Sequence, residues 1–393
     1  MKRRTSQYAK LGVDAAKANV WRIFGRIVHN DFPGAFVNIA RDPETLGGVF
    51  TMHADGDGSK FVQRALHYLE TGDQQVFRGA VDNAFSMNTG DIAASGFVFE
   101  RWVLTQILNI NGLNVPKELI MEQIALRVES LLKLYRSYGF KMTYFMGGET
   151  ADLPDQVNSA VYDVAVYAEA QEMDLIKGNV KPGDVIYGFA SDGQATWEMT
   201  PNFGIMANGL SLGRICTMRR SYGLKYPFLS RRKNVYRGRF GVRDNFDSLN
   251  VSQALMSPTR QWAILIRVLI DKLKREGLFH MLHGISMNTG GGATKIAHVG
   301  NGIIYIKKMP NPPPIFRLIK RESRETWRNM FQTFNCGVGI DVVGENDPDF
   351  RRVLKKVGWE TCVKMFELGF CYPNSSRKNR VSLDTPFGKF DDY

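Results

Sequence analysis

Apolar positions along the chain recur with two different periods, and together these predict an α/β protein. Between Pro116 and Tyr138 the apolar residues recur at three- and four-residue steps, which is typical of a helix with one buried face. Residues 161–170 (VYDVAVYAEA) alternate in the way expected of a half-buried strand. Further helices are expected over 14–28, 58–71, 77–88 and 257–276, and further strands over 50–53, 185–191, 302–308 and 334–343.

A proline-glycine turn at 181–184 (KPGD) lies between two such sets of elements. A chain of 393 residues is long enough for two domains. We therefore expect one domain over 1–180 and a second over 181–393, the latter with a basic insertion near 214–250.

Four short polar segments are flanked or interrupted by glycine, and we expect them to be loops. They are ADGDGSK (54–60), NTGD (88–91), GGETAD (147–152) and NTGGGATK (288–295). Carboxylates from the first three suit a hard cation such as Mg²⁺, and backbone N–H groups of the fourth suit an anion. Together they fit a nucleoside triphosphate; ordinary surface turns remain the alternative for each segment taken alone.

Two common cation and phosphate motifs are excluded at the first of these segments. In an EF-hand that started at Asp55 the twelfth position would be a bidentate glutamate, but here it is Leu66. No GxxxxGK[ST] sequence is present, so this is not a Walker loop.

Composition narrows the class of protein further. The four cysteines show no CxxC spacing, which favours reduced thiols in the cytoplasm over a zinc site or a disulfide framework. No apolar run approaches a membrane span, and no secretory signal is expected. The net charge of +12 is concentrated in residues 214–243, where aromatic residues are interleaved. We interpret this segment as a solvated insertion or a pocket for small anions, and do not expect nucleic acid as a partner.

The order of the motifs resembles that of the phosphoribosylformylglycinamidine cyclo-ligases, also called aminoimidazole ribonucleotide synthetases, of the PurM superfamily. The matching segments run from the N-terminal region to residue 339: YAKLGVD (8–14), ADGDGSK, GGETAD, KPGDVIYGFAS, ANGLSLGR (207–214), SPTR (257–260), TGGG (289–292) and FNCGVG (334–339). The combination of GGETA, SPTR and FNCGVG is specific.

The resemblance implies a fold and an activity. The fold would have two α/β (α+β) domains: an N-terminal ATP-binding domain whose sheet forms a barrel at a homodimer interface, and a C-terminal mixed sheet flanked by helices. The activity would be ATP-dependent ring closure of formylglycinamidine ribonucleotide in purine biosynthesis. ATP would phosphorylate the formamide oxygen, an amidine nitrogen would attack that carbon, and phosphate would leave.

The resemblance also assigns roles to residues. Catalytic roles would fall to Lys60, which would offset phosphate charge, to Asn208, and to His283. Mg²⁺ would be held by Asp55, Asp91 and Glu149. The contacts to ATP would come from Asp55, Gly56, Lys60, Asp91, Gly148, Glu149, Thr150, Gly290, Gly291 and Gly292.

Several positions depart from the family pattern. Met287 and Asn288 stand where related enzymes often have a histidine before the TGGG loop, and Met206 stands where some members have another. His283 is the candidate replacement, with a structural hydrogen bond as the open alternative. Gly90 replaces a common Asn or Asp, and Asp57 is additional. The lysine that some members have in the first helix is not clearly aligned, with Lys17 and Arg26 as substitutes.

Two alternatives follow from these departures. One is another superfamily member that phosphorylates a different substrate. A selenophosphate synthetase would need a cysteine in residues 31–60, a hydrogenase-maturation member would end in cysteine, and this chain has neither feature. The other alternative is a catalytically weakened homologue that binds a nucleotide or nucleic acid.

Overall fold

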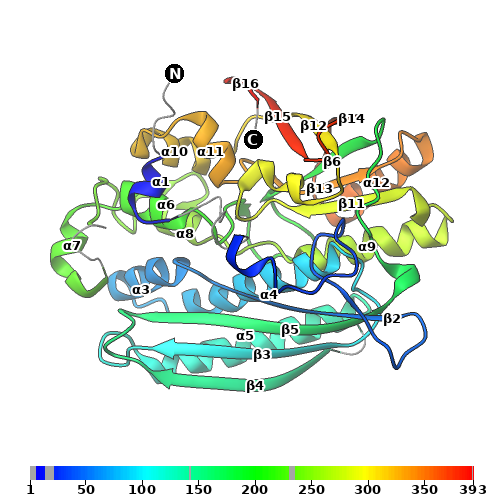
Figure 1. Ribbon diagram of the computed structural model, residues 1–393. Helices are drawn as coiled ribbons and strands as arrows, with labels where there is room; N and C mark the ends of the chain where they lie inside the picture. Colours follow the sequence, from blue (N-terminus) through cyan, green and yellow to red (C-terminus); the bar gives the residue numbers. More distant parts are fainter. Residues whose placement is uncertain (1–5, 14–21, 141–142, 230–234, 392) are drawn as a thin grey trace.

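Two β-sheets, one from each half of the chain, organise the fold, with helices packed between them (Figure 1). The structure is a computed structural model that describes residues 6–13, 22–140, 143–229, 235–391 and 393. The strands of the first sheet all precede the turn at 181–184, and those of the second all follow it. The division at residue 180 stays a prediction, but it agrees with this separation.

The N-terminal sheet has the strand order β1-β2-β5-β3-β4, in which only β3 and β4 are parallel. Its strands are β1 (Ala40–Arg41), β2 (Gly48–Gly56), β3 (Trp102–Ile110), β4 (Thr143–Asp152) and β5 (Ala160–Gln171). The alternation seen in residues 161–170 is confirmed, because every second residue of β5 is buried. β4 is an edge strand.

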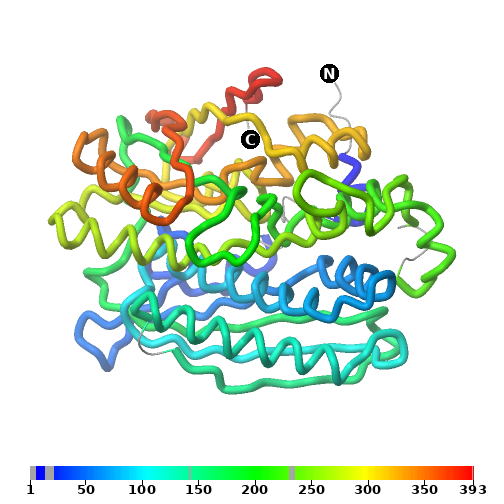
Figure 2. Tube along the Cα trace, turned by 180° about the vertical axis from the view of Figure 1, so that it is seen from behind, coloured from blue at the N-terminus to red at the C-terminus, as the bar shows by residue number. Residues whose placement is uncertain are grey.

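Helices cover one face of this sheet and leave the other open. They are α3 (Lys60–Thr71), α4 (Arg78–Ala93) and α5 (Lys117–Ser137), and α5 is seen along the strands in Figure 2. The open face exposes large apolar side chains, among them Met52 at 71% and Tyr144 at 48%. These two lie in one cross-strand row, because Met52 pairs with Tyr167, which pairs with Val103, which pairs with Tyr144.

The C-terminal sheet is mixed and flanked by helices, as expected. Its order is β11 (Leu282–Met287), β13 (Val338–Gly344), β6 (Val185–Ala190), β14 (Met365–Pro373), β12 (Ile303–Lys308), β15 (Arg380–Thr385) and β16 (Gly388–Phe390). β12 and β15 are parallel and the other pairs antiparallel. The flanking helices are α9 (Trp262–Arg275), α10 (Pro314–Ser323), α11 (Trp327–Thr333) and α12 (Pro348–Thr361). The described residues of one copy form no closed barrel, and the barrel expected at a homodimer interface stays a prediction.

Three local predictions are wrong. NTGD (88–91) lies inside α4, and GGETAD lies within β4. SPTR precedes α9, which begins only at Trp262. The helix expected over 77–88 is confirmed as α4, but its continuation through NTGD was missed. α4 packs against both the N-terminal sheet and α9, so nearly every residue is buried and no polar face marks the helical period. Most of the helix expected at 14–28 lies outside the described residues.

A buried lysine joins the two halves of the chain. Lys60, at the start of α3, is fully buried and its ammonium donates to the carbonyl oxygens of Ile205 (2.9 Å) and Ser257. It also lies 3.5 Å from Oδ1 of Asn83, which accepts from the backbone N and Oγ1 of Thr259, both at 2.7 Å. The SPTR segment is thereby fixed to the N-terminal half.

The same junction includes an ion pair. Asp57, fully buried, accepts from the guanidinium of Arg64 at 3.2 Å through both of its oxygens, and from the amide of Asn83. Arg64 lies directly over Gly79, where a Cβ would be 2.3 Å from Nη1. The additional aspartate of this chain is therefore a structural partner of Arg64 and Asn83.

We expect Lys60→Met to lower the free energy of unfolding by about 3 kcal/mol, because two buried carbonyl groups lose their donor. Urea unfolding measures this. The matched control is Lys133→Met, at an exposed lysine that pairs with Glu129 and whose loss costs about 0.5 kcal/mol or less. Equal urea midpoints for Lys60→Met and the wild type would contradict the assigned role.

Candidate active site

The ADGDGSK turn meets the ANG segment at the junction of the two halves. β2 ends at Gly56, and the turn that follows leads directly into α3. Ser59 and Ser211 are hydrogen-bonded through their hydroxyls at 2.9 Å. A Cβ on Gly58 would lie 4.0 Å from the carbonyl of Ala207. The two motifs, far apart in the sequence, therefore form one surface.

The TGGG loop reaches the same place from the C-terminal sheet. It follows β11 and leads into the 3₁₀ helix η6 (Gly292–His298). Gly290 lies against Asn208, because a Cβ there would be 3.1 Å from the amide nitrogen of Asn208. Oδ1 of Asn208 is buried and has no hydrogen-bond partner among the described residues. Asn208 is therefore positioned to bind a ligand together with this loop.

Not every predicted glycine is available to a ligand. The N–H of Gly292 donates to the carbonyl of Thr289 at 2.9 Å and so serves the turn of the loop itself. Gly56 makes room for the carboxylate of Asp163, which would be 1.7 Å from a Cβ. Gly148 has a φ of 153° and lies so close to the backbone of Gln106 that a Cβ would collide with it. At these three positions the structure explains glycine without a ligand.

A histidine that the sequence motifs did not indicate joins the carboxylates. His53 precedes Asp55 by two residues on β2, so both project from the helix-covered face. Nε2 of His53 is 3.4 Å from Oδ2 of Asp91, and Nδ1 is 2.9 Å from Oδ1 of Asn88. The amide nitrogen of Asn88 donates to three carbonyl oxygens, which fixes the orientation of the side chain. The amide oxygen therefore accepts from Nδ1 of His53.

The charge of this cluster favours an imidazolium. Burial by itself lowers the pKa of His53, but the hydrogen bond and charge of Asp91 raise it, to about 9. Asn88 and the nearby Asp55 act in the same direction. Alternation along β2 was the available signal, because it places His53 on the same face as Asp55.

Asp55 and Asp91 fit a magnesium ion, whereas Glu149 does not join them. Oδ1 of Asp91 is buried without a hydrogen-bond partner in the described part of the chain, and Mg²⁺ usually takes one or two carboxylates together with phosphate and water oxygens. The two strands between β2 and β4 separate Asp55 from Glu149 by roughly 14 Å. Glu149 pairs with Ile107, which is exposed on the open face of the sheet.

Consequently the described residues contain no group of three or more His, Cys, Asp or Glu side chains arranged to hold a metal. The predicted cluster of Asp55, Asp91 and Glu149 does not form within one copy of the chain. Paired strand residues project from the same face, and Asp55 pairs with the buried Val164. Two carboxylates thus face the helices and the third faces away from them.

The other two charged candidates lie elsewhere. The ammonium of Lys60 points into the interior, and burial holds its pKa well below the usual range, so it is committed to the junction described above. His283, at the other end of β11 from the TGGG loop, is held by Asp184 (2.8 Å) and lies 3.6 Å from Glu345. These contacts favour a structural role for His283 over a catalytic one.

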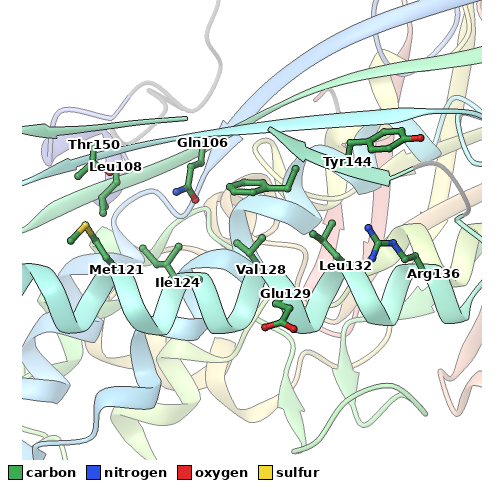
Figure 3. Close-up of a pocket in the computed structure, with 12 residues that line it drawn as sticks. Gln106, Leu108, Met121, Ile124, Val128, Glu129, Leu132, Arg136, Tyr144 and Thr150 are labelled. Atoms are coloured by element: carbon green, nitrogen blue, oxygen red, sulfur yellow. The ribbon is translucent and has the colours of Figure 1, made fainter. Parts of the chain in front are cut away.

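Thr150 lines a separate cavity. A cavity of about 630 Å³ lies between α5 and the strands β3 and β4, and Figure 3 shows Thr150 and Gln106 at its strand side. The helix side is mainly apolar, with Val128 and Leu132 among its residues, and Arg136 lies near one end. Thr150 is therefore grouped with apolar side chains and not with the carboxylates.

Two of the departures from the family pattern, Met287 and Gly90, are in contact with each other. Met287 is fully buried at the end of β11, and its sulfur lies where a Cβ of residue 90 would be, at 2.1 Å. Gly90 is thus required by Met287, although it stands inside a helix. The contact also brings Asp91, the next residue of α4, close to the start of the TGGG loop.

Three cations of the basic segment at 214–243 are held in ion pairs. Lys225 and Tyr226 both contact the carboxylate of Glu70 at 2.6 Å, Arg219 pairs with Asp244 at 3.4 Å, and Arg239 pairs with Glu322 at 3.1 Å. These contacts dock the segment on α3 and α10. No helix in the described ranges is long and apolar enough to span a membrane.

We expect Gly90→Ala to destabilise the protein by about 1–3 kcal/mol, because the new methyl group overlaps the sulfur of Met287. An alanine inside a helix would ordinarily stabilise it by about 1 kcal/mol. Thermal unfolding of Gly90→Ala, Met287→Ala and the double variant measures the coupling. The double variant should lose less stability, relative to the wild type, than the two single variants lose in sum. Losses that simply add would refute the contact.

Comparison with known proteins finds relatives that share the name phosphoribosylformylglycinamidine cyclo-ligase. The chain is 30% identical over 260 residues to the phosphoribosylformylglycinamidine cyclo-ligase of Pyrococcus furiosus. This match covers 65% of this chain and 62% of the relative. It is 29% identical over 212 residues to that of Methanococcus maripaludis (53% and 51%) and 27% identical over 259 residues to that of Desulfitobacterium hafniense (64% and 65%). The chain spans about half the length of the Methanococcus maripaludis relative. No family model matches.

Solved structures share the fold at low identity. The tt0281 protein of Thermus thermophilus superimposes with a TM-score of 0.53 at 12% identity, covering 94% of this chain and 97% of that one. Phosphoribosylformylglycinamidine synthase II of Thermotoga maritima gives 0.53 at 11% identity, covering 98% of this chain and 50% of that one. By sequence, then, this chain is a relative of the phosphoribosylformylglycinamidine cyclo-ligases, as its motifs predict.

Proposed function

We propose that this chain catalyses the ATP-dependent closure of the imidazole ring of formylglycinamidine ribonucleotide. The observation on which this rests is that four separated motifs meet at one place: Ser59 bonds Ser211, Asn208 lies on Gly290, and Met287 fills the space over Gly90. The sequence similarity to cyclo-ligases supports the same activity.

The chemistry needs a leaving group and charge neutralisation. The γ-phosphoryl group of ATP is transferred to the formamide oxygen, with ADP released. An amidine nitrogen then attacks the formamide carbon, the carbon–oxygen bond breaks, and phosphate leaves as the nitrogen gives up a proton. Phosphoryl transfer depends mainly on positioning and on neutralising charge. Asp55 and Asp91 would hold Mg²⁺, which would supply that neutralisation.

The remaining roles belong to residues of this chain. Asn208 and the loop at 289–291 bind an anionic or amide group of a ligand. His53 takes the proton-transfer role at Nε2, which is 3.4 Å from Asp91, because the position before the TGGG loop has lost its histidine. Lys60 supports the junction on which both loops depend and does not touch the phosphates.

The open face of the N-terminal sheet supports the proposal that a second copy of the chain takes part in the site. The open face of the N-terminal sheet exposes Met52, Ile107, Tyr144 and Met146, and a sheet face of this kind usually packs against a partner. Glu149 lies on that face, on the edge strand β4, so within one copy it cannot join Asp91 and Asp55, which faces the helices. We therefore propose a homodimer in which Glu149 of one copy contributes to the site of the other.

The activity is tested by ADP release with formylglycinamidine ribonucleotide, against a reaction that lacks this substrate. We expect substrate-dependent ADP release, and a loss of at least about a hundredfold in Asp91→Asn, because the buried carboxylate that binds the cation and pairs with His53 is neutralised. Asp271→Asn, at a surface pair of α9, serves as the matched control and should retain full activity.

The outcomes separate the alternatives. ADP release without the ribonucleotide, or with another acceptor only, indicates a different phosphoryl-transfer enzyme. ATP binding without turnover indicates a catalytically weakened homologue. A nucleic-acid role would show as binding that falls steeply with salt.

Mixing two inactive variants tests the sharing of Glu149. Asp55→Ala and Glu149→Ala should each be inactive alone. If Glu149 acts across the interface, mixed dimers contain one intact site, and an equimolar mixture regains about a quarter of wild-type activity. If all the contributing groups came from one copy, the mixture would stay inactive. The mixture is made by unfolding and refolding together, and its dimer content is checked by light scattering.

A further inference from the structure

A second buried lysine, in the C-terminal sheet, has no role in the proposed site. Nζ of Lys307, on β12, is 2.6 Å from Oδ2 of Asp341, on β13, and both side chains are completely buried. Burial lowers the pKa of Lys307 and raises that of Asp341. Removing two charges from water is costly, and well-packed apolar pairs often replace such an ion pair with no loss of stability. Stability alone therefore does not account for it.

The lysine also holds the far end of the TGGG loop. Its ammonium donates to the carbonyl oxygen of Ala293 at 2.8 Å. Ala293 is the second residue of η6, directly after the glycines. The ammonium is held in place by Asp341, and it therefore holds the carbonyl of Ala293 in place through the second hydrogen bond.

The aspartate is linked to the near end of the loop. Asn288 follows β11 and is buried, and its side-chain amide donates to the carbonyl of Val338 at 3.0 Å. Lys307 and the Asn288 side chain both lower the pKa of Asp341, against the larger effect of burial. Asp341 also pairs with Ser286 across β11 and β13. The ion pair thus contacts the far end of the loop directly, and β13, which carries Asp341, holds the near end through Val338.

The strand order shows how unusual this connection is. β12 and β13 are not neighbours, because β14 and β6 lie between them. The residues opposite Lys307 and Asp341 on those strands are both glycines, Gly369 and Gly188. The two long-range partners therefore meet across strands that have no side chain at those positions.

We propose that the Lys307–Asp341 pair is a positioning device for the TGGG loop, which it holds directly at Ala293 and, through β13, at Asn288, in the shape that receives an anionic group. The nature of that group rests on the proposed function, whereas the restraint on the loop does not. Neither residue touches the ligand, so both are positioning residues.

The test is the double variant Lys307→Met/Asp341→Leu, which removes both charges together and leaves no unpaired buried ion. We expect a thermal midpoint equal to or above that of the wild type, with amide hydrogen exchange at 289–293 at least about tenfold faster. The matched control is Lys272→Met/Glu360→Leu, which removes a lysine–carboxylate pair between α9 and α12 (2.8 Å) and should leave the loop protected. Unchanged loop exchange in the first variant would overturn the proposal.

Ligand binding gives the second readout. With ATP as the probe, we expect the double variant to raise KM about tenfold or more with a smaller change in kcat, since the loop binds but does not react. Wild-type KM in a variant whose loop exchanges faster would overturn the link to binding. If the wild type neither binds ATP nor releases ADP, the proposed function fails, and the exchange result decides the positioning role alone.

A variant that cannot fold would not end the test. Asn288→Ala keeps the ion pair and removes only the contacts at the near end of the loop. We expect faster exchange at 289 and 290 and retained protection at Ala293. Wild-type exchange throughout the loop in this variant would overturn the proposal.

Discussion

The site depends on a buried polar junction more than on the residues that would meet a ligand. Lys60 and Asn83 together tie the ADGDGSK turn, the segment before Asn208 and the SPTR segment to one another. A charged group that is buried must have its hydrogen bonds satisfied, so the three segments have little freedom to separate. The specificity of the junction comes from this requirement. Apolar contacts could join the halves as strongly, but they would not fix the positions of individual carbonyls.

Both buried lysines serve the backbone. Lys60 donates to carbonyls next to the ANG and SPTR segments, and Lys307 donates to the carbonyl that follows the TGGG loop. A lysine near a phosphate-binding motif is usually interpreted as a phosphate ligand. Here the geometry separates the two tasks: the loops face the ligand, and the ammonium groups lie behind them. In the proposed reaction, positive charge for the triphosphate would come from other groups, such as His53 and the metal ion that Asp55 and Asp91 would hold.

The sequence was sufficient for most helices and strands, but not for the glycine-flanked polar segments or the packing. The periods in residues 117–137 and 160–171 are strong because each element has one buried and one exposed face. α4 has no exposed face, so its NTGD looked like a loop. The separation of Glu149 from Asp55 follows from strand order, and no local pattern encodes strand order. Lys307 is consistent with alternation in β12, but a charged residue ordinarily marks the end of a buried run.

The loss of the family histidine and the presence of His53 are connected through α4. Met287 occupies the space above Gly90 from one side, and His53 reaches Asp91, the next residue, from β2. A methionine at 287 excludes a side chain at 90, which removes the polar residue common in related enzymes. An imidazole from β2 returns a titratable group to the same turn of α4. Gly90 therefore accommodates Met287, and Asp91, the next residue, pairs with Nε2 of His53. The imidazole is held at both nitrogens, by Asn88 and by Asp91, beside the carboxylates that would bind a metal ion.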